Sequence, residues 1–157
     1  MGSPLGIQGV EVMYQRQFET SADSFATSDA TNGYLYPILL PEGYIWRIDT
    51  FFVLAATNYV AVNTSYQTFT LQDASGNDIA SVANGPATGG LAIGPAVATG
   101  IDEVMTSTYQ YINCTDNAVA INVVTAATGS GLAMVGLKFI VLATPWRAKP
   151  ATVASYG

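Results

Sequence analysis

The chain has 157 residues, of which half are hydrophobic and 10% are charged, and its formal net charge is −6. It contains no histidine and one cysteine, so the most frequent general base and metal ligand is missing and no intrachain disulfide can form. Five basic residues argue against nucleic-acid binding, which needs clusters of Lys and Arg to displace counterions. We therefore expect a single domain that is not an enzyme and has no catalytic residues, no cofactor and no metal.

A mean hydropathy of +0.31 raises the question of a membrane span. A spanning helix needs about 20 consecutive apolar residues. The apolar run Leu132–Ala143 is shorter than this and contains Lys138, and residues 85–101 are interrupted by Gly and Pro. No basic region and apolar core of a signal peptide follow Met1. We expect a soluble, unexported protein without a membrane partner.

The N-terminal part of the chain predicts little regular structure. Residues 1–9 contain three Gly and one Pro, which is typical of an extended arm. Residues 10–18 can form a strand or a short covering segment. Residues 20–33 are rich in Thr, Ser, Asp and Asn and therefore predict a loop.

Two strands are expected next, on either side of a turn. Tyr34–Leu40 contains Pro37, which confines this strand to a sheet edge or a bulge. Residues 41–43 (Pro-Glu-Gly) have the composition of a tight turn. Tyr44–Ala55 is the clearest strand, and strict alternation would place one mostly large, apolar set of side chains in the core. That expected set comprises Tyr44, Trp46, Ile48, Thr50, Phe52 and Leu54.

The rest of the chain also predicts strands. Gln67–Asp73 alternates, with Phe69 and Leu71 inward, and a turn over 74–77 leads into Asp78–Val82. Calcium needs more carboxylates than this turn supplies, so we interpret it as a hairpin. Three further strands are expected at Ser107–Asn113, Ala118–Thr125 and Leu132–Ala143.

Many short β-branched and aromatic runs, separated by Gly, Asn, Asp and Pro, indicate a β-sandwich or barrel. We expect an all-β fold, a single jelly-roll-like β-sandwich over residues 10–143 with extended N- and C-terminal arms at 1–9 and 144–157. The Cys and Trp pattern of an immunoglobulin-like sandwich is missing. Among the three candidate folds, the jelly-roll-like sandwich is favoured over the immunoglobulin-like sandwich, and an up-and-down barrel ranks third.

Two segments are candidate interfaces. The C-terminal segment gathers the second tryptophan and two of the five cations, and Trp and Arg are favoured interface anchors. A tail folded back over its own domain would explain this segment equally well. The long loop over residues 84–100 has no charge and carries apolar side chains, which favours packing against something. The candidate contact residues are Trp146, Arg147, Lys149, Leu91, Ile93 and Val97.

Other candidate sites are weaker. Tyr109 and Tyr111 are expected on one face of a strand, where they could form an exposed ligand platform. Asp102 and Glu103 are adjacent and would point to opposite sides of a strand, so they do not form a convergent acid–base pair. Cys114 has no basic neighbour to activate it and is expected to be a small buried or half-buried residue.

The succession Y-L-Y-P-I-L-L-P-E-G-Y-I-W-R-I-D-T-F-F-V from Tyr34, followed by T-F-T-L-Q-D-A-S-G-N from Thr68, resembles the small β-sandwich decoration (cement) proteins of tailed bacteriophage capsids and the related head-fibre bases. The likeness covers about Tyr34 to Pro145 and includes no diagnostic motif, so no functional residue is carried over. The resemblance implies a homotrimer on the capsid exterior, made in the host cytoplasm, that bridges subunits of the major capsid protein.

Three hypotheses follow. The first is a non-enzymatic capsid decoration protein whose neutral, apolar exterior is covered by copies of itself and by the capsid, with the arms supplying attachment. The second is a carbohydrate- or receptor-binding module of a phage fibre or adhesin that uses Tyr109 and Tyr111. The third is a hydrolase built from carboxylates alone.

Overall fold

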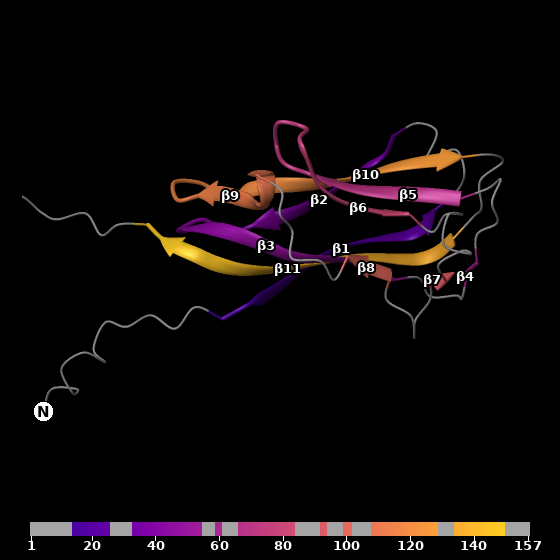
Figure 1. Cartoon of the computed structure of the whole chain (residues 1–157), viewed down its shortest axis with the longest axis horizontal. Coiled ribbons are helices and arrows are strands. Elements are labelled where there is room, and N and C mark those ends of the chain that lie inside the picture. Colours follow the sequence, from indigo (N-terminus) through magenta and orange to yellow (C-terminus); the bar gives the residue numbers. More distant parts are fainter. Residues whose placement is uncertain are drawn as a thin grey trace, which may run out of the picture.

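The computed structural model describes residues 14–25, 33–54, 59–60, 66–83, 92–93, 99–101, 108–128 and 134–149. These residues are mainly β-strands arranged in two layers (Figure 1). One short 3-10 turn, η2 (Thr108–Gln110), accompanies them. Within these ranges no helix is long and apolar enough to cross a membrane.

Sheet A forms one layer and is antiparallel throughout. Its strand order is β1 (Arg16–Phe25), β11 (Met134–Ala148), β3 (Tyr44–Leu54) and β8 (Thr99–Ile101). The short strand β9 (Tyr111–Cys114) also pairs with β3, along the part of β3 that β8 leaves open.

Sheet B forms the second layer and is also antiparallel. Its order is β2 (Leu35–Leu40), β10 (Val119–Thr128), β5 (Tyr66–Gln72) and β6 (Asp78–Ala83). A separate two-strand ladder joins β4 (Tyr59–Val60) to β7 (Ala92–Ile93).

The strand order identifies a jelly roll. Near the N-terminus the chain passes from sheet A (β1) to sheet B (β2) and back to sheet A (β3). Near the C-terminus it again passes from sheet B (β10) to sheet A (β11). Strands from the two ends of the chain are thereby interleaved: β11 lies between β1 and β3, and β10 lies between β2 and β5. This is the double Greek-key arrangement of jelly rolls. The predicted all-β, jelly-roll-like sandwich is confirmed.

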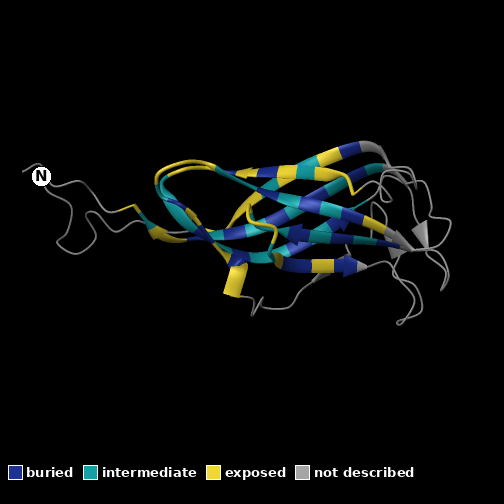
Figure 2. Ribbon diagram, turned by 90° about the horizontal axis from the view of Figure 1, so that it is seen from above, coloured by how far each residue is buried: buried dark blue, intermediate teal, exposed yellow. Residues whose placement is uncertain are grey.

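The core lies between the sheets, and buried residues alternate with more exposed ones along strands such as β2, β5 and β11 (Figure 2). Phe139 of β11 meets Phe69 of sheet B with ring centroids 5.4 Å apart. Trp46 is fully buried, and its indole N–H donates to the carbonyl of Pro41 at 2.9 Å, so the buried donor is satisfied. Phe69 and Leu71 face inward, as their alternation predicts.

A β-bulge in β3 corrects the expected core face. Thr50 pairs with Leu142 and Ile48 with Ala143, which leaves Asp49 as an extra residue without a partner. An extra residue shifts the alternation by one, so every side chain beyond it changes face. Trp46 and Ile48 are buried as expected. Beyond the bulge, however, Phe51 and Val53 are buried in place of Phe52 and Leu54.

A second register shift lies in β11. Pro145 pairs with Trp46 and Arg147 with Ile45, so Trp146 is the extra residue. Because β11 keeps pairing with the first residues of β3, it extends to Ala148. The expected domain boundary at residue 143 is therefore too early, and residues 144–148 belong to the sandwich and not to a C-terminal arm.

The N-terminal segment is also more regular than predicted. Pairing with β11 runs from Arg16↔Ala143 to Phe25↔Met134, so β1 includes Thr20–Phe25, which the sequence predicted to be part of a loop. The polar residues tolerate a strand because the cross-strand ladder supplies their backbone hydrogen bonds. The proposed arm at 1–9 and residues 150–157 lie outside the described residues.

The predicted turns are present. The carboxylate of Asp73 accepts bonds from the backbone N–H of Ser75 at 2.9 Å and of Asn77 at 2.8 Å. These bonds close the hairpin between β5 and β6 that the sequence predicted. Gly43, in the turn before β3, has φ of 102°, a conformation that favours glycine. β2 pairs with β10 alone in its sheet, as Pro37 predicted for an edge strand.

Candidate interaction surfaces

Among the described residues, no group of three or more His, Cys, Asp and Glu side chains could hold a metal ion. Cys114 is buried, and burial raises the pKa of its thiol although a backbone hydrogen bond from Val119 opposes the shift. The protonated thiol is a poor nucleophile, in keeping with its expected packing role. Asp102 and Glu103 lie outside the described residues.

The first candidate surface lies where the two bulges face solvent on the outer side of sheet A. We call Arg47, Asp49, Tyr111 and Trp146 the bulge cluster. Arg47 Nε donates to Asp49 Oδ1 at 2.7 Å, and its guanidinium carbon lies 5.2 Å from the centre of the Trp146 ring. Tyr111, the register partner of Arg47, meets Trp146 edge-to-face with centroids 5.5 Å apart. Three strands, β3, β9 and β11, therefore fix the cluster.

Asp49 is the best-anchored member of this cluster. Burial disfavours its charged form, but hydrogen bonds from Gln15 (2.9 Å), Thr144 (2.5 Å) and Arg47 outweigh that effect, so the pKa of Asp49 lies below its ordinary value. The carboxylate is thus ionised at neutral pH and balances the charge of Arg47, 2.7 Å away.

The two tryptophans of the chain have opposite environments. Trp46 is 0% exposed, whereas Trp146 is 51% exposed. The sequence predicted Trp146 in an extended tail, but it lies in the last strand and packs against its own sheet. Tyr111 is 45% exposed beside it, so the cluster offers two aromatic side chains to solvent.

Tyr109 and Tyr111 do not share a strand face as expected. Tyr109 lies in η2, and β9 begins at Tyr111. Tyr109 is 46% exposed, so both rings reach solvent, but of the two rings Tyr111 is the one that contacts Trp146. The predicted platform is therefore replaced by Tyr111 with residues of β3 and β11.

The sequence reasoning did not select Arg47 and Asp49 as interface or ligand residues. One signal could have found them: the adjacent aromatic residues Phe51 and Phe52 do not fit strict inward and outward alternation, which is typical of a strand that contains a bulge.

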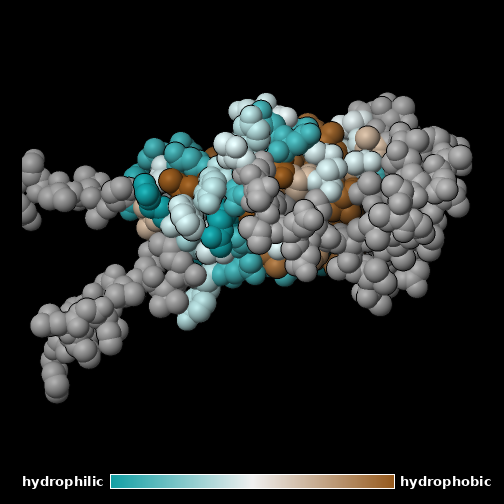
Figure 3. All heavy atoms as spheres, viewed as in Figure 1, coloured by the Kyte–Doolittle hydropathy of each residue, from teal (hydrophilic) through white to brown (hydrophobic). Residues whose placement is uncertain are grey.

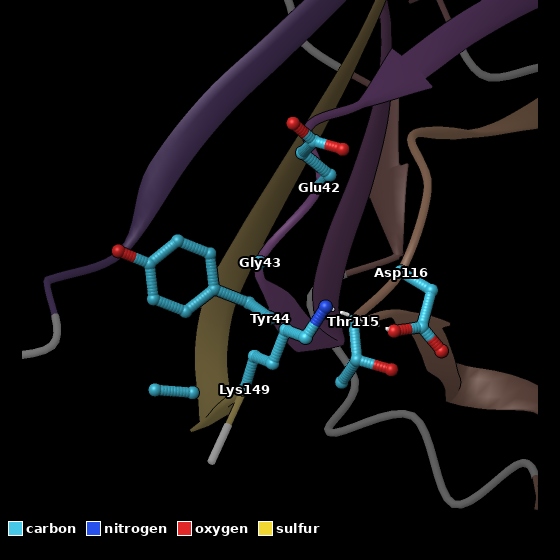
Figure 4. Close-up of a pocket in the computed structure, with 7 residues that line it drawn as sticks. Glu42, Gly43, Tyr44, Thr115, Asp116 and Lys149 are labelled. Atoms are coloured by element: carbon cyan, nitrogen blue, oxygen red, sulfur yellow. Dashed lines mark ion pairs between the residues drawn. The ribbon is translucent and has the colours of Figure 1, made fainter. Parts of the chain in front are cut away.

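The remaining C-terminal candidates, Arg147 and Lys149, lie at or just after the end of β11. Lys149 forms an ion pair with Asp116 at 3.0 Å, and its backbone N–H donates to Gly43 at 2.7 Å. Lys149 and Asp116 line an open pocket of about 430 Å³. In this pocket the Lys149 amine points to Asp116, and the ring of Tyr44 points away (Figure 4). Both charged side chains are more than half exposed, so this ion pair contributes little stability. Arg147 is exposed.

The loop candidates are mostly outside the described residues. Leu91 and Val97 fall there. Ile93 lies in β7, where its backbone pairs with Tyr59 of β4, and its side chain is not described.

A second candidate surface is the outer side of edge strand β2. Leu35, Pro37 and Leu39 point to solvent, and we call them the β2 apolar strip. Leu35 is 58% exposed and Leu39 is 63% exposed. Figure 3 shows hydrophobic residues reaching the described surface of one side of the molecule among hydrophilic ones.

Two solved structures of viral particles show a remote likeness to this chain. A chain in the virus-like particle of the extra small virus of the giant freshwater prawn Macrobrachium rosenbergii is 15% identical, with a TM-score of 0.33 over 92% of this chain and 91% of that chain. A chain of infectious bursal disease virus, Gx strain, is 11% identical, with a TM-score of 0.25 over 90% of this chain and 37% of that chain. No protein-family model and no curated protein sequence matches the chain. The jelly-roll assignment rests on strand order and register.

Proposed function

We propose that the protein is a non-enzymatic structural protein of a virion that associates with copies of itself. The observation that carries this proposal is the β2 apolar strip. Two leucines of one strand are more than half exposed on the same side, with Pro37 between them. A second copy of the chain that packs on this strip would cover the exposed leucines.

Side-chain contacts suit this surface better than strand addition. Thr125 donates its backbone N–H to the carbonyl of Tyr34, so these two residues form a hydrogen-bonded pair. Along an antiparallel ladder, hydrogen-bonded pairs alternate with pairs that are not hydrogen-bonded. Pro37 faces Asn122 in an intervening pair, and its backbone nitrogen therefore points to the free edge. Because proline has no N–H, the middle of this edge lacks a donor and resists further strand pairing.

The finer proposal follows the resemblance to phage decoration proteins. Copies of the chain would form a homotrimer on the exterior of a tailed-phage capsid and bridge subunits of the major capsid protein, after synthesis in the host cytoplasm. Residues 1–9 and the segment that follows Ala148 would supply attachment, because linked weak contacts raise one another's effective concentration. Of the six candidate contact residues, Arg147, Lys149, Leu91, Ile93 and Val97 are proposed for this attachment, whereas Trp146 packs in the bulge cluster.

The association state tests this proposal. The purified protein should sediment as a trimer, and replacing both Leu35 and Leu39 by Ser should shift it to a lighter species. The loss of buried apolar area weakens the contact by about 1–2 kcal/mol per leucine. Sedimentation velocity over a range of concentrations measures the shift.

A control variant tests whether the effect is specific to the β2 apolar strip or follows the loss of any exposed hydrophobic side chain. Tyr109→Ser removes another exposed hydrophobic side chain on η2 and should leave the trimer intact. A wild-type protein that stays monomeric at high concentration would contradict the proposal. So would a leucine double variant that sediments like the wild type.

A further inference from the structure

We propose that the bulge cluster is a binding site for a neutral polysaccharide, with one sugar ring against Trp146 and Tyr111 and its hydroxyls on Arg47 and Asp49. This activity goes beyond the structural role proposed above. It would give the surface of an assembled particle a way to adhere to a glycan.

The first argument is the position of the two bulges. Asp49 is the extra residue of β3 and Trp146 is the extra residue of β11, and both lie on the ladder that joins these two strands. A bulge disturbs a ladder and redirects a side chain, and bulges concentrate near functional sites. Here two bulges in neighbouring strands bring their extra residues to Arg47, which contacts both of them.

The second argument is that two exposed aromatic rings lie beside a fixed polar group, the Arg47 guanidinium. Trp146 and Tyr111 are each about half exposed, and they hold one another edge-to-face. The C–H groups of a sugar ring can pack on an exposed aromatic surface, while the ring's hydroxyls need donors and acceptors beside it. Arg47 lies beside the Trp146 ring, and Asp49 holds the Arg47 guanidinium in place.

The polar pair has hydrogen-bonding capacity left for a ligand. Arg47 uses Nε for its bond to Asp49, and no described residue accepts a bond from its two terminal Nη groups. Asp49 Oδ2 accepts from Gln15 and Thr144, whereas Oδ1 accepts from Arg47 alone among the described residues. A hydroxyl both donates and accepts, so adjacent hydroxyls of one sugar match a guanidinium beside a carboxylate.

Charge favours a neutral ligand. The Arg47 charge is balanced by Asp49 at 2.7 Å, and the whole chain has a formal charge of −6. An acidic polymer would be repelled by the net charge and would find no uncompensated cation in the cluster. The β2 apolar strip is the more suitable surface for a protein partner, because it carries no charged side chain.

Affinity electrophoresis tests the proposal with the full-length protein. The gels contain a β-glucan, a mannan, a galactan or a xylan, with alginate as the acidic comparison. Migration should be retarded by at least one of the neutral polymers and not by alginate. Trp146→Ala and Tyr111→Ala should each weaken retention about tenfold, as the loss of one stacking contact predicts. Tyr109→Ala, which removes an equally exposed tyrosine outside the cluster, should retain wild-type affinity.

Tryptophan fluorescence gives a second readout, which can be applied to the wild-type protein. The chain has two tryptophans, and Trp146 is exposed whereas Trp46 is buried. Acrylamide should therefore quench Trp146 selectively, and the retarding polysaccharide should protect it. Trp146→Phe should remove the quenchable component and keep part of the retention.

Four outcomes would overturn the proposal. The first is that no neutral polymer retards the wild-type protein or protects Trp146. The second is that alginate alone does so. The third is that the Trp146→Ala or the Tyr111→Ala variant binds as the wild type does. The fourth is that Trp146→Ala changes the sedimentation coefficient, which would assign the ring to a protein contact.

Discussion

At the scale of single residues, Asp49 connects the fold to the candidate site. It is the extra residue that inverts the alternation of β3. Its carboxylate also accepts hydrogen bonds from Gln15, Thr144 and Arg47. A bulge leaves backbone groups without their ladder partners and therefore costs stability. The charged hydrogen bonds of Asp49 offset part of that cost.

We expect Asp49→Asn to lower the free energy of unfolding by about 2 kcal/mol at neutral pH. Because the folded pKa of Asp49 lies below its ordinary value of 3.8, the ionised carboxylate stabilises the protein above that pH. The contribution disappears as the pH falls through the folded pKa. The difference between wild type and variant should thus shrink on acidification. Urea unfolding at pH 7 and at pH 3 measures it, and a difference that is independent of pH would contradict the assignment.

At the scale of elements, β2 exposes apolar side chains on a sheet edge, yet it carries Pro37 at its centre. The proline removes one N–H donor from the free side of the strand and so discourages edge-to-edge pairing. The strand can then present Leu35 and Leu39 to a partner through side-chain contact without acting as a template for aggregation.

Replacing Pro37 by Val restores the missing donor, and we expect faster aggregation at high concentration. Leu39→Val is the matched control, since it introduces the same β-branched side chain on the same exposed side of β2 without adding an N–H. Light scattering over time compares the two variants. Equal aggregation rates would show that the edge donor is not the controlling feature.

At the scale of the whole molecule, the last strand ties the C-terminal part of the chain into the sandwich. Residues Thr144–Ala148 pair with the beginning of β3, although the sequence predicted them to be an arm. The pairing holds the end of β11 beside Trp46, whose register partner is Pro145.

Two truncations distinguish the observed boundary from the predicted one. A chain that ends after Lys149 retains all of β11 and should unfold cooperatively with nearly the stability of the full chain. A chain that ends after Ala143 loses five residues of β11, four of them paired with β3, and should be less stable by at least about 3 kcal/mol. Denaturant unfolding followed by circular dichroism measures both. Equal unfolding midpoints for the two truncated chains would instead support the predicted arm that begins at residue 144.

Much of the fold could be predicted from the sequence because its signals are local. Alternation placed Phe69 and Leu71 in the core, Pro37 indicated an edge strand, and the polar residues after Gln72 indicated a hairpin. Spaced β-branched runs indicated a sandwich. The candidate site was predicted only in part, since Tyr111 and Trp146 were selected for separate reasons and their contact was not foreseen.

By itself, then, the sequence determined the class of fold, the turns and the low charge of the surface, because each depends on residues close together in the chain. Tertiary structure decided which side chains meet at the bulge cluster. Arg47 and Trp146 are about a hundred residues apart, and a single extra residue in either strand reverses the faces of everything beyond it. Such an extra residue is fixed by pairing between strands, which local alternation does not record.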